Sequence, residues 1–148
     1  MSDDFRDMLE ALLAEGVRFV VVGAHAVGLH ARPRATGDLD LLVEPTPDNG
    51  ARAWRALVRF GAPVASLEVR PEDLETPGIV VQVGVEPNRI DLMTTISGVS
   101  FEEAWSSREV AEWQGLEIPF LGRAALIANK RATGRLQDLA DLEALGEG

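Results

Sequence analysis

The stretch "RPRATGDLDLLVE", residues 32–44, places two aspartates at the start of an apolar run that is typical of a β-strand. Acidic residues are depleted in strands because they fit a half-buried pleated surface poorly. Side chains at i and i+2 of a strand point to the same face, about 6.6 Å apart along the chain. Asp38 and Asp40 are therefore expected on one face, and the apolar residues that alternate with them on the other: Leu39, Leu41 and Val43.

The apolar neighbours place both carboxylates beside a hydrophobic core, where an unpaired charge is very costly. Arginine side chains, backbone N–H groups or divalent cations can offset that cost. The simplest structural explanation is a turn at Gly37 and Asp38, with Asp40 paired to Arg34. For an isolated Asp-x-Asp motif, this explanation is the favoured one.

A third acidic residue lies in a second strand-like run, "RIDLMT" (89–94). Asp91 alternates with Ile90 and Leu92, which are expected to face the core. If the two strands are neighbours, the three carboxylates form one patch, and such clusters bind Mg²⁺ together with substrate phosphates. The structural alternative for Asp91 is an ion pair with Arg89, or an edge-strand charge that discourages aggregation.

Upstream of the acids, "VVVGA" (20–24) leads from a buried strand directly into a helix. The free N–H groups and the positive dipole end of a helix N-terminus attract anions. Gly23 and Ala24 have small side chains or none, so a phosphate can approach their backbone. A strand–glycine–helix junction is also an ordinary α/β turn, so the motif indicates a phosphate site only together with the acids.

The remaining patterns predict helices and strands in alternation. Helices are expected at 3–15 and 24–32, from Pro47 onward and around 101–105, and as a C-terminal pair within 122–146. Further strands are expected at 17–23, 78–85 and 110–114, followed by the segment 116–121. The runs 78–85 and 89–94 are expected to form a hairpin across "EPN". Trp54, Leu57 and Val58 are predicted to be the core face of the third helix. This mixture predicts an α+β protein with a mixed central β-sheet and flanking helices.

The composition of the chain argues against several classes of protein. With 148 residues, 46% hydrophobic and 26% charged, the chain is expected to form a single globular domain over residues 1–148. Its acidic N-terminus and short apolar runs predict neither a secretion signal nor a membrane span. The absence of cysteine excludes thiolate chemistry and fits a cytoplasmic protein. A net charge of −10 argues against general nucleic-acid binding, but not against a nucleotide bound through metal ions.

Taken together, "VVVGA", "GDLDLLV" and "RIDLM" resemble the signature of the nucleotidyltransferase superfamily, which has the DNA polymerase β-like fold. The combination of "RPRATGDLDLLV" with "ANKRATGRLQDLADLEAL" (128–145) is similar to the minimal nucleotidyltransferase-like proteins grouped with the abortive-infection, AbiEii-type toxins. One departure is Ala24, where the superfamily has a second glycine or a serine. Alanine keeps the backbone N–H donor but lacks a hydroxyl that could contact phosphate.

The resemblance implies Mg²⁺-dependent transfer of a nucleoside monophosphate from a nucleoside triphosphate such as ATP to a hydroxyl group. Two Mg²⁺ ions would be held by the catalytic acids Asp38, Asp40 and Asp91. The residues implied in nucleotide binding are Gly23, Ala24, Arg34, Thr36, Lys130 and Asp138, with Arg135 lining the cleft nearby. His25 is expected to flank the phosphate site. Lys130 also suits its helix end simply as a cation, and Asp138 and Asp141 suit the solvated face of an amphipathic helix.

The sequence leaves the acceptor open among RNA, a protein side chain and a small molecule. A homodimer or a partner protein is a further possibility, because so small a chain can borrow part of its substrate site. The alternative function is a non-catalytic or weakly catalytic interaction protein of the same fold, such as a component of a toxin–antitoxin pair. A third reading is a Mg²⁺-dependent phosphohydrolase that uses water as the acceptor.

Overall fold

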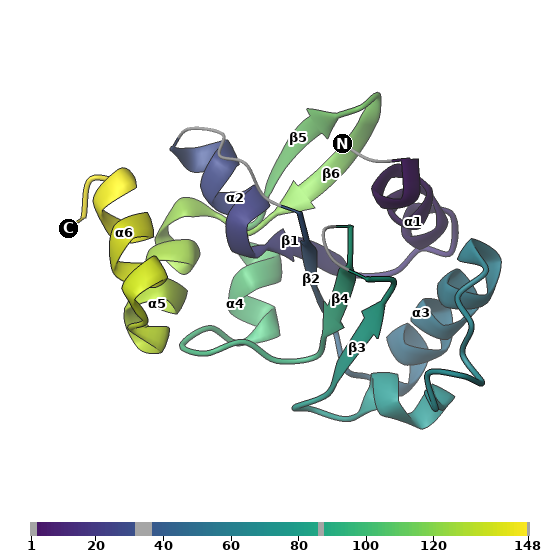
Figure 1. Ribbon diagram of the computed structural model, residues 1–148. Coiled ribbons are helices and arrows are strands. Elements are labelled where there is room, and N and C mark those ends of the chain that lie inside the picture. Colours follow the sequence, from purple (N-terminus) through teal and green to yellow (C-terminus); the bar gives the residue numbers. More distant parts are fainter. Residues whose placement is uncertain (1–2, 32–36, 86–87, 148) are drawn as a thin grey trace.

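The structure is a computed structural model that describes residues 3–31, 37–85 and 88–147. The described elements, in chain order, are α1 (Asp3–Ala14), β1 (Phe19–Val22), α2 (Gly23–His30), β2 (Leu39–Val43), α3 (Pro47–Phe60), the 3₁₀ helix η1 (Pro71–Glu75), β3 (Val80–Val83), β4 (Ile90–Met93), α4 (Phe101–Ser106), β5 (Glu109–Trp113), β6 (Leu116–Phe120), α5 (Arg123–Thr133) and α6 (Leu136–Ala144). The strands form one sheet in the order β3-β4-β2-β1-β6-β5 (Figure 1). The predicted α+β class with a mixed sheet is confirmed.

The centre of the sheet combines both strand directions. β1 pairs with β2 antiparallel, whereas β2 pairs with β4 and β1 with β6 in parallel. At the two edges β3 pairs with β4 and β5 with β6 antiparallel, so the expected hairpin of β3 and β4 is confirmed. Within the parallel pair, Asp40 lies opposite Asp91, which brings two acids distant in sequence side by side.

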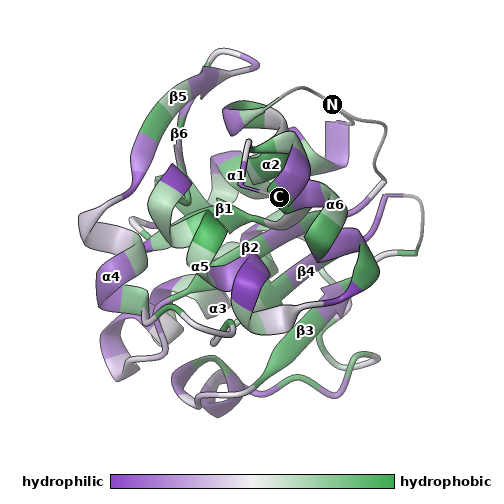
Figure 2. Ribbon diagram, turned by 90° about the vertical axis from the view of Figure 1, so that its left-hand side faces the viewer, coloured by the Kyte–Doolittle hydropathy of each residue, from purple (hydrophilic) through white to green (hydrophobic). Residues whose placement is uncertain are grey.

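Each face of the sheet has its own hydrophobic core. On one face α1, α3 and η1 cover the larger core, which includes Leu39, Leu41 and Ile90. On the other face α2, α4, α5 and α6 build a smaller core around Val20 and Leu42. Figure 1 shows these two groups of helices on opposite sides of the sheet, and Figure 2 looks onto the second group. The alternation predicted for residues 39–43 is confirmed, and it leaves Asp40 on the side of the smaller core.

Local signals set the ends of the helices as predicted. The Thr46 hydroxyl accepts a hydrogen bond from the Asn49 N–H at 3.3 Å, and Pro47 begins α3. Gly134 ends α5 in a left-handed conformation, with φ 61°. The predicted core face of α3 is wrong at one position: Val58 is 55% exposed. The helix buries Ala53 and Ala56 beside Leu57, and Val58 lies about 100° further around the helix than Leu57.

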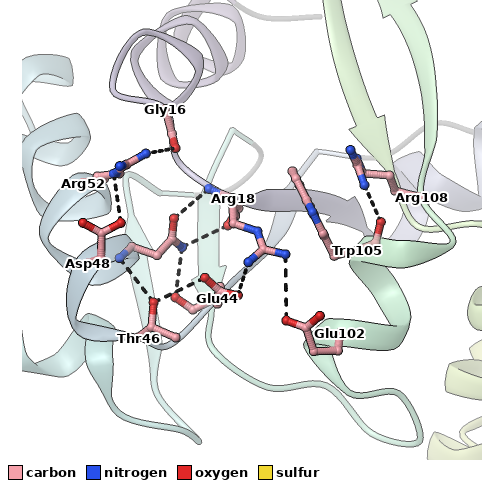
Figure 3. A network of polar contacts seen from close by, with 10 residues as sticks. Gly16, Arg18, Glu44, Thr46, Asp48, Arg52, Glu102, Trp105 and Arg108 are labelled. Carbon is pink, nitrogen blue, oxygen red and sulfur yellow. Dashed lines mark hydrogen bonds and ion pairs between the residues drawn. The ribbon is translucent and has the colours of Figure 1, made fainter.

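Partly buried polar contacts join the strands to the helices at the end of the sheet away from the acids. The Asn49 side chain accepts from the Arg18 N–H at 2.7 Å and donates to the Arg18 and Glu44 carbonyls at 3.1 and 2.9 Å. The Arg18 guanidinium donates to Glu44 and lies 4.9 Å from the Trp105 ring, beside α4 (Figure 3). These contacts attach α3 and α4 to the β1–β2 pair.

None of the helices in the described ranges combines the length and the apolar character that a membrane span requires.

Candidate active site

Three carboxylates meet on the sheet face that carries the smaller core. Asp40 and Asp91 are direct neighbours on the parallel strands β2 and β4, and Asp38 directly precedes β2. Ile90 and Leu92 point to the opposite face, into the larger core. The structure therefore places these three acids together, and the parallel β2–β4 register is the cause.

The acids line an open cavity of about 650 Å³ between the sheet and α5. Its acidic wall consists of Asp38, Asp40 and Asp91, and the basic groups that line the same cavity are Arg89, Lys130 and Arg135. The lining also contains four uncharged polar residues: Thr95, Ser97, Asn129 and Thr133. Opposite charges thus face one space, as a site for a metal-bound anion requires.

The backbone at Gly23 lies directly against the Asp40 side chain. It has a φ of +67°, which side chains rarely adopt, and a β-carbon there would overlap with the Asp40 carboxylate. Both facts require glycine at this position. Gly23 lines the cavity, whereas Ala24 is not among the described residues that line it. The structure therefore places only one of the two predicted backbone donors at the cavity wall.

The environment of Asp40 disfavours a negative charge. Burial, and then the nearby charges of Asp91 and Asp38, raise the pKa of Asp40 to about 6, although Arg89 acts in the opposite direction. Within the described part of the chain, Asp38 Oδ1 is buried and has no hydrogen-bond partner. In their chemistry, crowded carboxylates with an unsatisfied buried oxygen are the kind of oxygen donors that a hard divalent cation takes.

Arg89 neutralises part of this acidic cluster. Its guanidinium donates from Nε to Asp91 Oδ1 at 2.8 Å and from Nη2 to Asp91 Oδ2 at 3.2 Å. The same Nη2 lies 3.3 Å from Asp38 Oδ2. The ion pair between Asp91 and Arg89, which the sequence offers as the alternative to a metal site, is therefore also present. Within residues 3–31, 37–85 and 88–147, no group of three or more His, Asp or Glu side chains is arranged to hold a metal ion.

Lys130 is held by two acids of the following helix. Its Nζ lies 3.2 Å from Asp138 Oδ1 and 3.0 Å from Asp141 Oδ2, and the three side chains are exposed by only 6%, 0% and 2%. The alternative that Asp138 and Asp141 belong to a solvated helix face is wrong. Instead α6 buries these acids and leaves Leu136 87% exposed, because Lys130 offers them a buried cation.

Asp138 does not itself line the cavity, but it contacts two side chains that do. It binds Lys130 and also accepts hydrogen bonds from the Arg135 backbone N–H at 3.0 Å and from Arg135 Nε at 2.8 Å. Burial alone would raise the pKa of Asp138, but the hydrogen bonds from Arg135, Thr133 and Lys130 outweigh it and hold this pKa well below its usual range. Asp138 thus remains charged and orients two cavity-lining cations.

Some predicted residues are placed elsewhere. Arg34 and Thr36 fall outside the described residues. His25 packs against Phe5 and Trp113, with ring centroids 5.8 and 5.0 Å away, and does not line this cavity.

The sequence patterns did not indicate the uncharged polar residues that α5 and the loop before α4 contribute to the cavity. Asn129 is one of them: its side chain donates to the Ser97 carbonyl at 2.9 Å and attaches α5 to that loop. Only its position directly before Lys130 could have indicated it.

Solved structures share this fold. A candidate nucleotidyltransferase from Thermotoga maritima matches with a TM-score of 0.60 at 18% identity, over 97% of this chain and 88% of that one. An antigenic nucleotidyltransferase-like protein from Paracoccidioides brasiliensis matches with a TM-score of 0.51 at 13% identity, over 97% of this chain and 73% of that one. At these identities the likeness shows the fold, and it confirms the predicted polymerase β-like nucleotidyltransferase architecture.

Sequence comparison adds the family. No curated protein matches the chain. A family model described as "Nucleotidyl transferase of unknown function (DUF2204)" matches residues 1–147. That range contains the acids of β2 and β4, the glycine of α2 and the Lys130 cluster of α5 and α6. The match covers nearly the whole chain, and the protein therefore belongs to this nucleotidyl transferase family.

Proposed function

We propose that the protein transfers a nucleoside monophosphate from a nucleoside triphosphate to a hydroxyl acceptor in the cavity between β2, β4 and α5. The observation that carries the proposal is the β2–β4 register, which sets Asp40 beside Asp91. This acidic wall shares one cavity with the cations Lys130 and Arg135. Carboxylates for metal ions and cations for phosphates are the two sets of groups that this chemistry needs.

A divalent cation, Mg²⁺ in the proposal, would be held by Asp38, Asp40 and Asp91, and two such ions are the expected number. The fit rests on the buried, unpartnered Asp38 Oδ1 and on the raised pKa of Asp40. When bound, such ions neutralise the triphosphate and lower the pKa of the acceptor hydroxyl. They would also relieve the repulsion among the three carboxylates.

The protein's own groups then position the reactants. Lys130 and Arg135 direct positive charge toward the phosphates, and Asp138 holds both of these side chains. Gly23 lets the nucleotide approach the backbone beside Asp40. The acceptor oxygen forms a bond to the α-phosphorus, the bond from that phosphorus to the leaving pyrophosphate breaks, and Asp91 takes the hydroxyl proton. Arg34 and Thr36 are proposed to flank the same site.

The acceptor is the part of the proposal that labelling can decide. Purified protein is incubated with cell extract, Mg²⁺ and each nucleoside triphosphate labelled at the α-phosphate. We expect label on one fraction, whether RNA, protein or small molecule, and none with Asp38→Asn. Release of free nucleoside monophosphate without any labelled acceptor would instead indicate hydrolysis. If no nucleotide gives a product that depends on Asp38, the transferase proposal is wrong.

A second candidate is a weakly catalytic or non-catalytic interaction protein of the same fold, such as a toxin–antitoxin component. The ion pairs of Arg89 with Asp91 and Asp38 favour it, because they neutralise the acids without a metal. Isothermal titration with nucleoside triphosphates, with and without Mg²⁺, separates the two candidates. Metal-dependent binding that is lost in Asp40→Ala supports the transferase, and absence of binding under both conditions supports the interaction protein.

A further inference from the structure

Arg89 binds carboxylate oxygens of Asp91 and Asp38 that the proposed metal ions would need as ligands. Its guanidinium spans Asp91 and Asp38, with three N–O distances of 2.8, 3.2 and 3.3 Å. All three side chains are largely shielded from water, with exposures of 25% for Arg89, 24% for Asp38 and 9% for Asp91. A guanidinium stays charged at every physiological pH, so this cation is a permanent neighbour of the acids.

We propose that Arg89 is the resident counter-ion of the acidic cluster, that it competes with divalent cations for Asp38 and Asp91, and that nucleotide phosphates draw it away. The inference rests on the proposed function, since it concerns the same site. It assigns Arg89 a role in binding and positioning, and it makes metal and nucleotide binding cooperative.

The competition follows from charge and from shared atoms. A divalent ion that coordinates Asp91 takes oxygens that now accept N–H groups of Arg89, and its charge repels the guanidinium at that distance. Without the metal, loss of Arg89 would leave crowded carboxylates unpaired, which is costly. The acids therefore bind either the Arg89 guanidinium or a divalent ion.

The side chain can move while its backbone stays fixed. Arg89 lies directly before β4, and its carbonyl accepts a hydrogen bond from the Leu39 N–H at 2.9 Å. This bond attaches residue 89 to β2, whereas the long side chain can rotate within the cavity that it lines. A planar guanidinium binds phosphate oxygens as well as it binds carboxylates. A bound triphosphate thus offers Arg89 a second partner and frees Asp38 and Asp91 for metal.

The test measures metal binding directly, with Mn²⁺ as a paramagnetic probe. Free Mn²⁺ is titrated by electron paramagnetic resonance against the wild type and Arg89→Gln, with and without a triphosphate analogue that cannot be cleaved between the α- and β-phosphates. Without nucleotide, we expect Arg89→Gln to bind Mn²⁺ roughly tenfold more tightly than the wild type. With nucleotide, we expect the enhancement of Mn²⁺ affinity to be clearly smaller in Arg89→Gln than in the wild type.

Two further variants control for charge and folding. Arg55→Gln removes one cation from an exposed position on α3, on the other side of the sheet, and should leave the Mn²⁺ affinity within about twofold of the wild type because exposed charges are screened. Arg89→Lys keeps the charge but lacks the planar fork, and should fall between the wild type and Arg89→Gln. Circular dichroism reports whether each variant is folded.

The outcomes separate the inference from the proposed function. Equal or weaker Mn²⁺ binding by both Arg89 variants overturns the inference, even if nucleotide transfer is observed. Absence of Mn²⁺ binding in the wild type and in all variants overturns both the inference and the metal dependence of the proposed function. Tighter binding by Arg89→Gln supports the inference even if labelling finds no acceptor.

Discussion

The surroundings of Asp40 lower the stability of the folded protein when its carboxylate is charged. Its raised pKa of about 6 compares with 3.8 for a free side chain. Because the folded state binds the proton more tightly, Asp40 contributes stability below pH 4 that is lost as the pH rises through about 6. Such a cost is typical of functional sites, where electrostatic environments serve binding rather than folding.

We therefore expect Asp40→Asn to stabilise the metal-free protein at neutral pH. At pH 7.5 without divalent ions, the free energy of unfolding should rise by an amount on the order of 1 to 3 kcal/mol. At pH 4 the gain should vanish, because Asp40 is then protonated in the folded wild type. Urea denaturation at both pH values measures the difference. A destabilising effect at pH 7.5 would contradict this account of Asp40.

Gly23 combines a backbone requirement with a steric one. We expect Gly23→Ala to destabilise the protein more than Gly134→Ala does. Both glycines have positive φ, +67° and +61°, but only at Gly23 would a β-carbon overlap with Asp40. Gly134→Ala should cost about 1 to 2 kcal/mol for its conformation alone. Thermal denaturation compares the two variants, and equal losses would show that the Asp40 contact is unimportant.

At the scale of elements, α5 and α6 are joined by charges rather than by a purely apolar seam. Lys130 from α5 meets Asp138 and Asp141 from α6, and all three side chains are buried. A buried ion pair adds little net stability, but breaking one leaves an uncompensated charge. The cluster therefore makes the position of α6 depend on one lysine that also lines the cavity.

Replacing Lys130 by Met should destabilise the protein by roughly 3 to 5 kcal/mol, because the buried Asp141 loses its ion pair with Lys130 and Asp138 keeps only Arg135. The adjacent Arg131 offers a matched control, since its side chain is 59% exposed and pairs with Glu147 at 3.4 Å. Arg131→Met should change the stability by less than about 1 kcal/mol. Urea denaturation measures both variants, and a neutral Lys130→Met would show that the cluster is not charged as described.

Asn49 joins three elements through one side chain. Its amide bonds to the backbone of Arg18 before β1 and of Glu44 after β2, while Asn49 itself lies in the first turn of α3. Asn49→Ala would remove the partner of those partly buried backbone groups, and should cost about 2 to 3 kcal/mol. Asn88→Ala, at an exposed position, is the control. Differential scanning calorimetry should show a lower melting temperature for Asn49→Ala alone.

At the scale of the whole molecule, the cavity joins segments that lie far apart in the sequence. Its lining comes from the start of α2, from β2 and β4, and from α5. A ligand that contacts all of them stabilises the folded state against local opening in every segment at once. The hairpin of β5 and β6 contributes no residue to the described lining and offers an internal reference.

Hydrogen exchange can test this arrangement. With Mg²⁺ and a non-hydrolysable nucleoside triphosphate, we expect slower amide exchange at the start of α2, in β2 and β4 and in α5, and an unchanged rate in the β5–β6 hairpin. Asp40→Ala should lose the effect. Protection confined to a single segment, or found only in the hairpin, would place the ligand outside this cavity.

The sequence by itself determined the local structure and the identity of the acids. The alternation in residues 39–43, the Thr46 and Pro47 start of α3 and the Gly134 stop of α5 depend on near neighbours in the chain, and the structure agrees with each. Val58 was misplaced because a helix face depends on what packs against it.

Only the tertiary structure decided which charges meet. The parallel β2–β4 register brought Asp91 to Asp40, Arg89 bridged Asp91 to Asp38, and Lys130 drew Asp138 and Asp141 into the interior. The physical reason is that backbone preferences act over a few residues, whereas the cost of burying a charge depends on partners from anywhere in the chain. A pattern of local polarity therefore indicated the acids of β2 and β4, but left those of α6 open between a role in the site and a solvated helix face.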